Sequence, residues 1–165
     1  MTKTPAHLPF PLHGVRPFRP EDRQQVLALA PRLTEGVASW RDPVGVASAA
    51  VGWVTGSMAS ADEPGHAVFV AELDGRVGGV ITLSERAHFS GQTDAYVGEL
   101  IVAAGLERRG IATELMRAAE AWAAQRDYAF ITLETGAAND PARKLYAALG
   151  FLEEEVRLTK AVGPD

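Results

Sequence analysis

The sequence predicts a single α/β domain in which a mixed, mostly antiparallel sheet with a central parallel pair of strands is flanked by helices. Strand-like apolar runs are interspersed with segments of helical periodicity, which favours this class over an all-helical or all-strand fold. Asp74-Gly75 separates two strand-like runs and predicts an antiparallel hairpin. Further along, a helical segment joins two apolar strands, the connection that parallel strands require. At 165 residues the chain is long enough for one hydrophobic core.

The first half of the chain contributes a strand, two helices and the hairpin. Val15–Arg19 is expected to form the strand, and the helix that begins at Pro20 has acidic residues in its first turn, where they suit the helix dipole. The second helix covers about Val44–Met58, although each of its three glycines destabilises a helix by about 0.5–1 kcal/mol relative to alanine. Its inward-facing residues are expected to be Val46, Ala50, Trp53 and Val54. The hairpin strands are Ala67–Leu73 and Arg76–Ser84, followed by a polar loop at about Glu85–Asp94.

The second half continues as strand, helix, strand, helix and strand, which gives the whole chain the order β-α-α-β-β-β-α-β-α-β. In sequence order these elements are Ala95–Val102, Arg109 to about Arg126, Ala129–Glu134, a helix capped by Asp140 and closed at Gly150, and Phe151–Thr159. Pro141 suits the first position of the last helix, because an N–H there would have no helical partner. The alternating residues of Phe151–Thr159 predict the final strand.

The composition argues against several classes of protein. Hydrophobic residues make up 47% of the chain and charged residues 22%, as in ordinary globular domains. There is no cysteine, so the chain has no disulfide, no thiolate nucleophile and no cysteine-based metal site. The four histidines show no ligand spacing, and no metal is expected. The net charge of −5 argues against nucleic acid or an anionic membrane as a partner and mildly favours a cationic substrate.

The N-terminal residues 1–13 contain several prolines and are expected to form a flexible arm ahead of a domain of residues 14–165. They lack the apolar stretch of a signal peptide, and no apolar run in the sequence approaches the length that spans a bilayer. We therefore expect a cytoplasmic protein without a membrane partner.

The segment Glu99–Met116 carries the strongest functional signal. An apolar strand end, Leu100-Ile101-Val102, runs through a small-residue turn into a helix whose first turn is basic and contains Gly110. The first N–H groups of a helix have no intrahelical partner and the helix dipole adds partial positive charge, which together make an anion site. A P-loop would need Lys and Ser or Thr where Ile111 and Ala112 stand. The G-x-G-x-x-G pattern of dinucleotide-binding proteins is absent.

A third phosphate-binding pattern fits the chain. Glu107-Arg108-Arg109-Gly110-Ile111-Ala112 matches the glycine and the small residue of (Q/R)-x-x-G-x-(G/A). Asn139–Phe151, NDPARKLYAALGF, matches N-x-x-A-x-x-L-Y-x-x-x-G-F. In this order, and on these elements, the two motifs resemble the acyl-CoA pyrophosphate loop and the later helix of the GNAT superfamily of N-acetyltransferases. The resemblance covers roughly residues 14–160 and implies a GNAT-like fold.

The resemblance implies acetyl-CoA as the cosubstrate. In the family, backbone N–H groups of the loop bind the pyrophosphate, and the matching positions here are Arg108, Arg109, Gly110, Ile111, Ala112 and Thr113. The pantetheine arm pairs with the main chain of the preceding strand, which implies a role for Ile101 and Val102. Asn139 either hydrogen-bonds the cofactor, as in the family, or caps its helix. Glu107 stands where the family usually has Gln or Arg, so its carboxylate either points to solvent or is neutralised by Arg108 or Arg109.

Two residues are candidates for the chemistry. By resemblance, the Tyr146 hydroxyl lies near the CoA sulfur and protonates the departing thiolate, a role for a phenol whose pKa near 10 exceeds that of a thiol. The alternative is a core aromatic. Glu99 lies among apolar neighbours that partly remove it from water and is the best candidate for the general base. Alternatively, the Glu99 carboxylate lies on the outer face of the sheet, and an ordered water acts as the base. Asp94, Tyr96 and His88 are weaker candidates for that base.

The resemblance implies transfer of an acetyl group from acetyl-CoA to a primary amine of a small molecule, protein or peptide. Direct attack is expected, since the chain has no cysteine and no recognisable serine triad. Trp40 and Phe89 lie in segments that roof the acceptor site in this family, and each either lines that pocket or packs in the core. A non-catalytic acyl-CoA-binding sensor on the same fold is the alternative function, and a nucleotide-phosphate enzyme is disfavoured. The family also makes a homodimer plausible.

Overall fold

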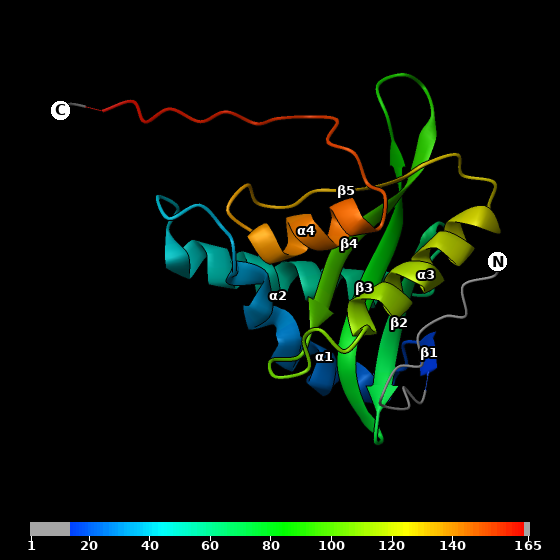
Figure 1. Cartoon of the computed structure of the whole chain (residues 1–165). Helices are drawn as coiled ribbons and strands as arrows, with labels where there is room; N and C mark the ends of the chain where they lie inside the picture. Colours follow the sequence, from blue (N-terminus) through cyan, green and yellow to red (C-terminus); the bar gives the residue numbers. More distant parts are fainter. Residues whose placement is uncertain (1–13, 164–165) are drawn as a thin grey trace, which may run out of the picture.

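A computed structural model describes residues 14–163, and the expected N-terminal arm lies outside the described residues (Figure 1). The elements, with 3-10 helices written as η, are β1 (Gly14–Pro17), η1 (Pro20–Asp22), α1 (Arg23–Leu29), η2 (Ala30–Thr34), α2 (Pro43–Ala59), β2 (His66–Leu73), β3 (Arg76–Ala87), β4 (Thr93–Val102), α3 (Ile111–Ala124), β5 (Ile131–Leu133) and α4 (Asp140–Ala148). No helix in this described range is both long enough and apolar enough to cross a bilayer.

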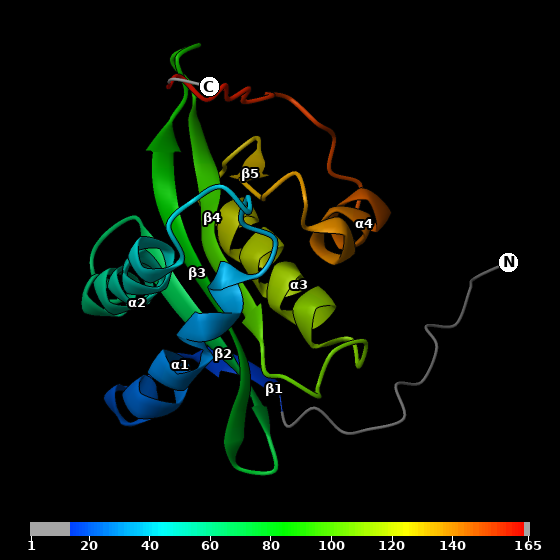
Figure 2. The ribbon, with the colours of Figure 1, turned by 90° about the vertical axis from the view of Figure 1, so that its left-hand side faces the viewer.

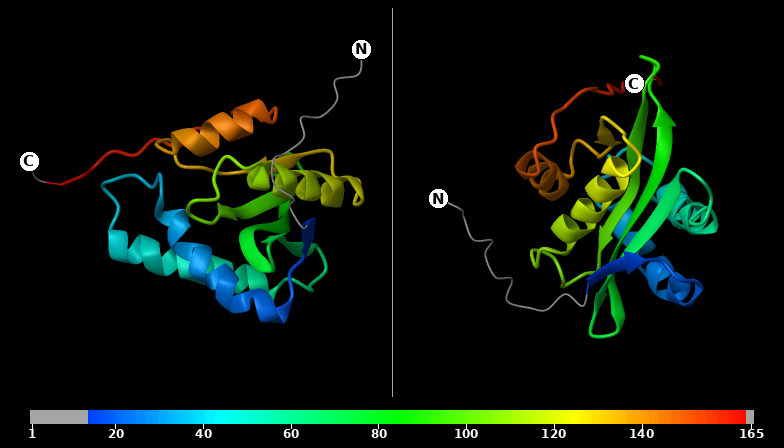
Figure 3. Two further views of the ribbon diagram at one scale, coloured as in Figure 1. Left: turned by 60° about the horizontal axis from the view of Figure 1, so that its bottom comes forward. Right: turned by 90° about the vertical axis from the view of Figure 1, so that its right-hand side faces the viewer.

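The five strands form one sheet in the order β1-β2-β3-β4-β5. Neighbouring strands from β1 to β4 are antiparallel, and β5 pairs with β4 in parallel. Helices α1 and α2 cover one face of the sheet, whereas α3 and α4 lie on the other (Figure 2 and Figure 3). The predicted mixed sheet with one parallel pair is confirmed. That pair lies at the edge of the sheet because the final strand predicted from the sequence does not form.

Each face of the sheet has its own apolar core. On the α3 face, the strands bury Ile81, Leu83 and Val97 against Ile111, Leu115, Met116 and Trp122. On the α1–α2 face, they bury Val68, Val70, Val80 and Ile101 against Val26, Leu29, Val54 and Met58. Both clusters follow from the alternation of side chains along a strand, which sends successive residues to opposite faces.

The segment Phe151–Thr159 is not a strand, and that prediction is wrong. The described residues after α4 have no secondary structure, and the segment runs away from the body of the molecule (red in Figure 1). Leu152, Val156 and Leu158 are between 76% and 91% exposed. Alternation gives a segment the capacity to pair, but a strand forms only against a partner edge, and no described strand pairs with this segment.

Two smaller differences concern the hairpin and α2. The β3–β4 ladder extends into the expected loop, since residues 85–87 pair with residues 93–95. Residues 85–87 and Thr93 of this ribbon are exposed, so polar residues carry no penalty at those positions, whereas Asp94 and Ala95 are buried.

On α2, Ala50, Val54 and Met58 are buried, but Trp53 is 51% exposed, against the prediction. The helix has no charged residue, so its apolar pattern does not by itself select the buried face.

Candidate active site

Strands β4 and β5 pair over a short distance and then separate. Their parallel register runs only from Ala95↔Ile131 to Val97↔Leu133, whereas β4 continues to Val102. From residue 98 onward, β4 therefore has one edge without a strand partner in the described chain. An open edge of this kind presents N–H and C=O groups with which an extended ligand can pair.

The direction of the β4 hydrogen bonds identifies the residues on this open edge. The Glu99 N–H donates to Thr82 Oγ1 at 2.9 Å and the Ala103 N–H to the Gly78 carbonyl at 2.9 Å, both toward β3. Backbone groups alternate between the two edges of a strand. The groups of Ile101 therefore also point toward β3, and those of Leu100 and Val102 point toward the open edge. Leu100 thus takes the position that the sequence analysis gave to Ile101.

A β-bulge in β4 determines where the Glu99 side chain points. The register changes from Leu83↔Val97 to Ile81↔Leu100, so Gly98 and Glu99 together oppose Thr82. A bulge inserts one residue and reverses the face to which the following side chains point. Regular alternation would have sent Glu99 into the α3-side core with Val97. The bulge instead directs it to the α2 face of the sheet.

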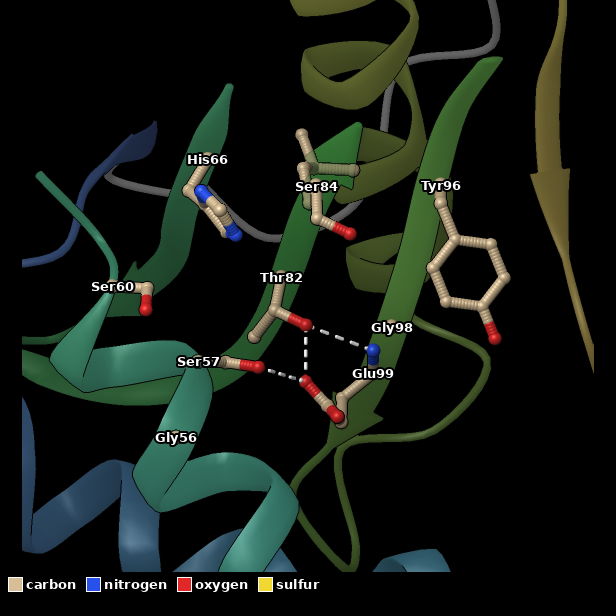
Figure 4. Close-up of a pocket in the computed structure, with 10 residues that line it drawn as sticks. Gly56, Ser57, Ser60, His66, Thr82, Ser84, Tyr96, Gly98 and Glu99 are labelled. Carbon is tan, nitrogen blue, oxygen red and sulfur yellow. Dashed lines mark hydrogen bonds between the residues drawn. The ribbon is translucent and has the colours of Figure 1, made fainter. Parts of the chain in front are cut away.

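Hydroxyl groups from two elements hold the Glu99 carboxylate (Figure 4). Glu99 is 8% exposed, and its Oε2 accepts hydrogen bonds from Ser57 Oγ of α2 at 2.8 Å and from Thr82 Oγ1 of β3. A cavity of about 240 Å³ opens beside the carboxylate. Its lining residues are Gly56, Ser57, Ser60, His66, Thr82, Leu83, Ser84, Tyr96, Gly98 and Glu99. A buried carboxylate with neutral hydrogen-bond donors and no ion pair in the described chain is suited to accept a proton or to bind a cation.

The turn after β4 gives the start of α3 the geometry of a candidate anion site. Gly110 is the N-cap and adopts a left-handed conformation (φ 82°), which glycine adopts without steric cost. The first bond of the helix runs from the Glu114 N–H to the Gly110 carbonyl at 3.0 Å. The N–H groups of Ile111, Ala112 and Thr113 precede this bond and have no partner within the helix. They carry the partial positive charge of the helix dipole, as the sequence predicts.

The carboxylate of Glu107 in this turn is paired with Arg32 of η2. Arg32 Nη2 lies 2.7 Å from Glu107 Oε1, and Arg32 Nε donates to the Val102 carbonyl at 3.2 Å. The pKa of Glu107 lies below its ordinary value, chiefly because backbone N–H groups of Glu107 and Gly105 bind its carboxylate, with a smaller contribution from Arg32. The sequence analysis missed Arg32, because nothing local relates it to a loop 75 residues further along the chain.

The motif of α4 positions the Tyr146 ring. The helix is capped by Asn139, whose Oδ1 accepts from the Ala142 N–H at 3.4 Å, so the capping role predicted as one alternative for Asn139 is confirmed and the cap predicted at Asp140 is one residue too late. At the other end, Gly150 (φ 92°) closes the helix, and the Phe151 N–H donates to the Tyr146 carbonyl at 3.0 Å. The Phe151 ring meets the Tyr146 ring edge-on, with centroids 5.7 Å apart. Burial raises the pKa of the Tyr146 phenol.

The loop after η2 contacts the segment before α4 through two glycines. A Cβ atom built on Gly36 would lie 2.4 Å from the Asn139 Cβ, and one built on Gly136 would lie 2.2 Å from the Gly36 carbonyl oxygen. Side chains at these positions are therefore excluded as long as the loops keep this contact. The contact joins the helix-bearing segments of opposite faces of the sheet, and no local sequence pattern indicates it.

The other sequence candidates lie mostly outside the cavity. Trp40 is 69% exposed and Phe89 89% exposed, and neither is among the lining residues. His88 bonds Ser90 through Nδ1 at 2.7 Å, and neither it nor the buried Asp94 lines the cavity. Tyr96 does line it, beneath the Arg86 guanidinium, which lies 4.4 Å from the ring centroid. Ser57 and Thr82 were missed, since isolated hydroxyl residues give no sequence signal.

An α/β fold with an opened strand pair, followed by an anion-binding helix start, has the architecture of an acyl-transferring enzyme. The chain belongs to the acetyltransferase (GNAT) family, whose model matches residues 35–151. No curated protein matches this chain in sequence.

Solved structures of acetyltransferases share the fold at low sequence identity. A putative acetyl transferase from Pyrococcus furiosus has a TM-score of 0.72 and 20% identity, over 90% of this chain and 98% of that one. A GCN5-related N-acetyltransferase from Ralstonia eutropha JMP134 has a TM-score of 0.69 and 24% identity, over 90% and 97%. The AAC(6')-Iy enzyme, in complex with a bisubstrate analogue of CoA and acetylneamine, has a TM-score of 0.66 and 20% identity, over 90% and 97%.

Proposed function

We propose that this chain transfers an acetyl group from acetyl-CoA to a primary amine by direct attack of the amine on the thioester. The observation that carries the proposal is the Glu99 carboxylate, which a β-bulge directs into a cavity that Tyr96 and Gly98 of β4 also line. Glu99 comes one residue before the open-edge residue Leu100. This position supplies a proton acceptor next to the edge on which an extended thioester arm would lie. The family to which the chain belongs supports acetyl-CoA as the donor.

The anion site and the open edge fit acetyl-CoA. The N–H groups of Ile111, Ala112 and Thr113 would bind the pyrophosphate, with added charge from Arg108 and Arg109. The backbone groups of Leu100 and the N–H of Val102 would pair with the pantetheine arm, since the Val102 carbonyl accepts from Arg32. Asn139 already accepts from the Ala142 N–H, so its amide nitrogen remains as a donor to the cofactor. Acetyl-CoA supplies the activated acetyl group.

Proton transfers in the proposed reaction fall to Glu99 and Tyr146. Ser57 and Thr82 fix one oxygen of Glu99, and the carboxylate accepts the proton that the amine loses as its C–N bond forms. As the C–S bond breaks, Tyr146 donates its phenolic proton to the sulfur. Its raised pKa keeps the phenol protonated throughout the neutral range.

Acetyl-CoA binding is tested at Ala112, in the first turn of α3. Its helical backbone accepts any side chain without left-handed strain, unlike that of Gly110. A ligand at about 100 times its Kd stabilises the fold by roughly 2.7 kcal/mol. We expect acetyl-CoA to raise the Tm of the wild type but not that of Ala112→Gln or Ala112→Glu, because either long side chain obstructs the phosphates and the carboxylate also repels them. An equal Tm shift in all three proteins would place the phosphate site elsewhere.

The proton-transfer roles are tested with a panel of amines and detection of released thiol. Tyr146→Phe should lower kcat about 10–100-fold and leave acetyl-CoA affinity unchanged, as expected for a group that acts only in the reaction. Glu99→Gln should lower the rate near neutral pH, with recovery at high pH where free amine is abundant. Wild-type rates in both variants would refute both roles. Acetyl-CoA binding without transfer to any amine would favour a non-catalytic acyl-CoA sensor.

A further inference from the structure

The cavity beside Glu99 has only one carboxylate. None of its ten lining residues is an Asp, Lys or Arg, and Glu99 is the only acidic side chain among them. They come from α2, β2, β3 and β4, and Figure 4 shows Ser57 and Thr82 bonded to the carboxylate, with Ser60, His66 and Ser84 further from it. A ligand in this cavity therefore meets one negative charge and several neutral polar groups.

One oxygen of Glu99 remains for a ligand. The hydrogen bonds from Ser57 and Thr82 both end on Oε2, and Oε1 has no hydrogen-bond partner among the described residues. The carboxylate is 8% exposed and has no cationic partner there. Burying an unpaired charge is costly, so a bound ammonium group would relieve that cost. A second ammonium group in the same cavity would lose its hydration without a second carboxylate to compensate.

Neutral hydrogen-bonding groups occupy the rest of the wall. The hydroxyls of Ser60 and Ser84 line the cavity and have no hydrogen-bond partner among the described residues. His66 Nδ1 lies 3.1 Å from the Pro64 carbonyl, which can only accept, so Nδ1 carries a proton. Nε2 is then the remaining polar atom of that ring. These groups match a ligand hydroxyl or carbonyl.

The charged pair beside the lining residue Tyr96 adds no net charge to the cavity. Arg86, which stacks on the lining residue Tyr96, is paired with Glu134 at 2.8 Å, so the two together contribute no net charge. The cavity of about 240 Å³ is partly open to solvent, so the charge of its lining, rather than its volume, restricts the ligand.

We propose that this cavity binds a small amine that carries one positive charge and a hydroxyl or carbonyl group, and that it discriminates against diamines and larger polycations. The proposal rests on the function proposed above and specifies its acceptor class. The ammonium group binds Glu99 Oε1, and the neutral polar end of the ligand meets Ser60, Ser84 and His66. The fold neighbour AAC(6')-Iy binds an analogue built on acetylneamine. The proposal therefore predicts that this chain prefers an acceptor with one positive charge over a polycationic one.

Calorimetric titration of the full chain tests the proposal with three probes. They are 5-aminopentanol, cadaverine, which is the diamine with the same carbon chain, and kanamycin as a polycation. We expect 5-aminopentanol to bind at least about tenfold more tightly than cadaverine, a difference of about 1.4 kcal/mol, and kanamycin to bind no better than cadaverine. Glu99→Gln should weaken 5-aminopentanol binding at least about tenfold. The matched control, Glu120→Gln on the exposed side of α3, should bind like the wild type.

A second variant tests the proposal even if Glu99→Gln does not fold. Ser84→Val adds an apolar side chain to the cavity wall, suits a strand, and should abolish 5-aminopentanol binding. Equal or tighter binding of cadaverine or kanamycin would overturn the proposal, as would failure of 5-aminopentanol to bind. Thiol release from acetyl-CoA is measured separately. The expected binding pattern without thiol release would refute the proposed acetyl transfer and leave the ligand class of the cavity standing.

Discussion

Replacing Thr82 by valine tests whether hydrogen bonding or apolar packing holds the bulge, because the two effects change the free energy of unfolding in opposite directions. Thr82 is 3% exposed, and its hydroxyl both donates to Glu99 Oε2 and accepts from the Glu99 N–H at 2.9 Å. Valine keeps the β-branched shape but removes both hydrogen bonds. The bulge then loses the side chain that fixes its two residues.

The magnitude follows from these two bonds. A hydrogen bond to a charged group contributes about 1.5–3 kcal/mol, and a buried N–H left without an acceptor costs about 1–3 kcal/mol. The methyl group that replaces the hydroxyl offsets about 0.8 kcal/mol through burial. Thr82→Val should therefore lower the free energy of unfolding by about 2–5 kcal/mol. Thr82→Ser keeps the hydroxyl and loses one methyl group, a loss of about 1 kcal/mol.

Urea unfolding of the wild type, Thr82→Ser and Thr82→Val at pH 7 provides the assay. We expect the order of stability to be wild type, then serine, then valine, with an unchanged dependence on urea concentration. Because serine is the smaller and less apolar side chain, packing alone would give the opposite order of the two variants. A valine variant as stable as the serine variant would refute the assignment of the bulge geometry to the Thr82 hydroxyl.

Two further predictions concern stability elsewhere in the chain. Hydrogen bonds from the Arg16 guanidinium, at 2.7 and 2.9 Å, hold the pKa of Asp22 below its ordinary value, so the stability this carboxylate contributes is present above about pH 4 and lost as the pH falls further. Asp22→Asn should lower the free energy of unfolding by about 1.5–3 kcal/mol at pH 7 and by less at pH 3 in urea titrations. Gly136→Ala should lower the Tm, because its Cβ meets the Gly36 carbonyl oxygen, whereas Gly52→Ala, with no atom within 4 Å of its Cβ on α2, should gain about 0.5–1 kcal/mol. A Tm for Gly136→Ala equal to that of the wild type would show that the two loops do not hold this contact.

The elements of the fold were predictable where the pattern was periodic and the partner was near in sequence. The Asp74-Gly75 hairpin forms because a turn and two adjacent strands specify one another locally. The segment Phe151–Thr159 shows the limit of this argument, since alternation indicates only that a segment is able to pair. The helix α2 shows another limit, because a helix with no charged residue leaves its buried face to be selected by the sheet on which it packs.

In the candidate site too, local features were predictable from the sequence and contacts between distant residues were not. Gly110 and the turn before α3 were predictable, since a glycine turn at a helix start depends on consecutive residues, whereas anion binding there stays a prediction. The cap at Asn139 and the closure at Gly150 were also within one motif, apart from a one-residue error at the cap. The pairing of Glu107 with Arg32 was not predictable, because it joins residues that come together only when η2 packs beside β4.

The sequence by itself determined the order of the elements up to α4, the glycine turn before α3 and the helix that carries Tyr146, because each depends on periodicity or on contacts within one turn of chain. Only the tertiary structure decided that Glu99 faces a cavity on the α2 side. That direction depends on one extra residue in β4 opposite Thr82 and on a hydroxyl that α2 brings to the carboxylate. A bulge is a relation between two strands, so neither strand's sequence contains it, and the side chain that it turns reaches the cavity only in the assembled sheet.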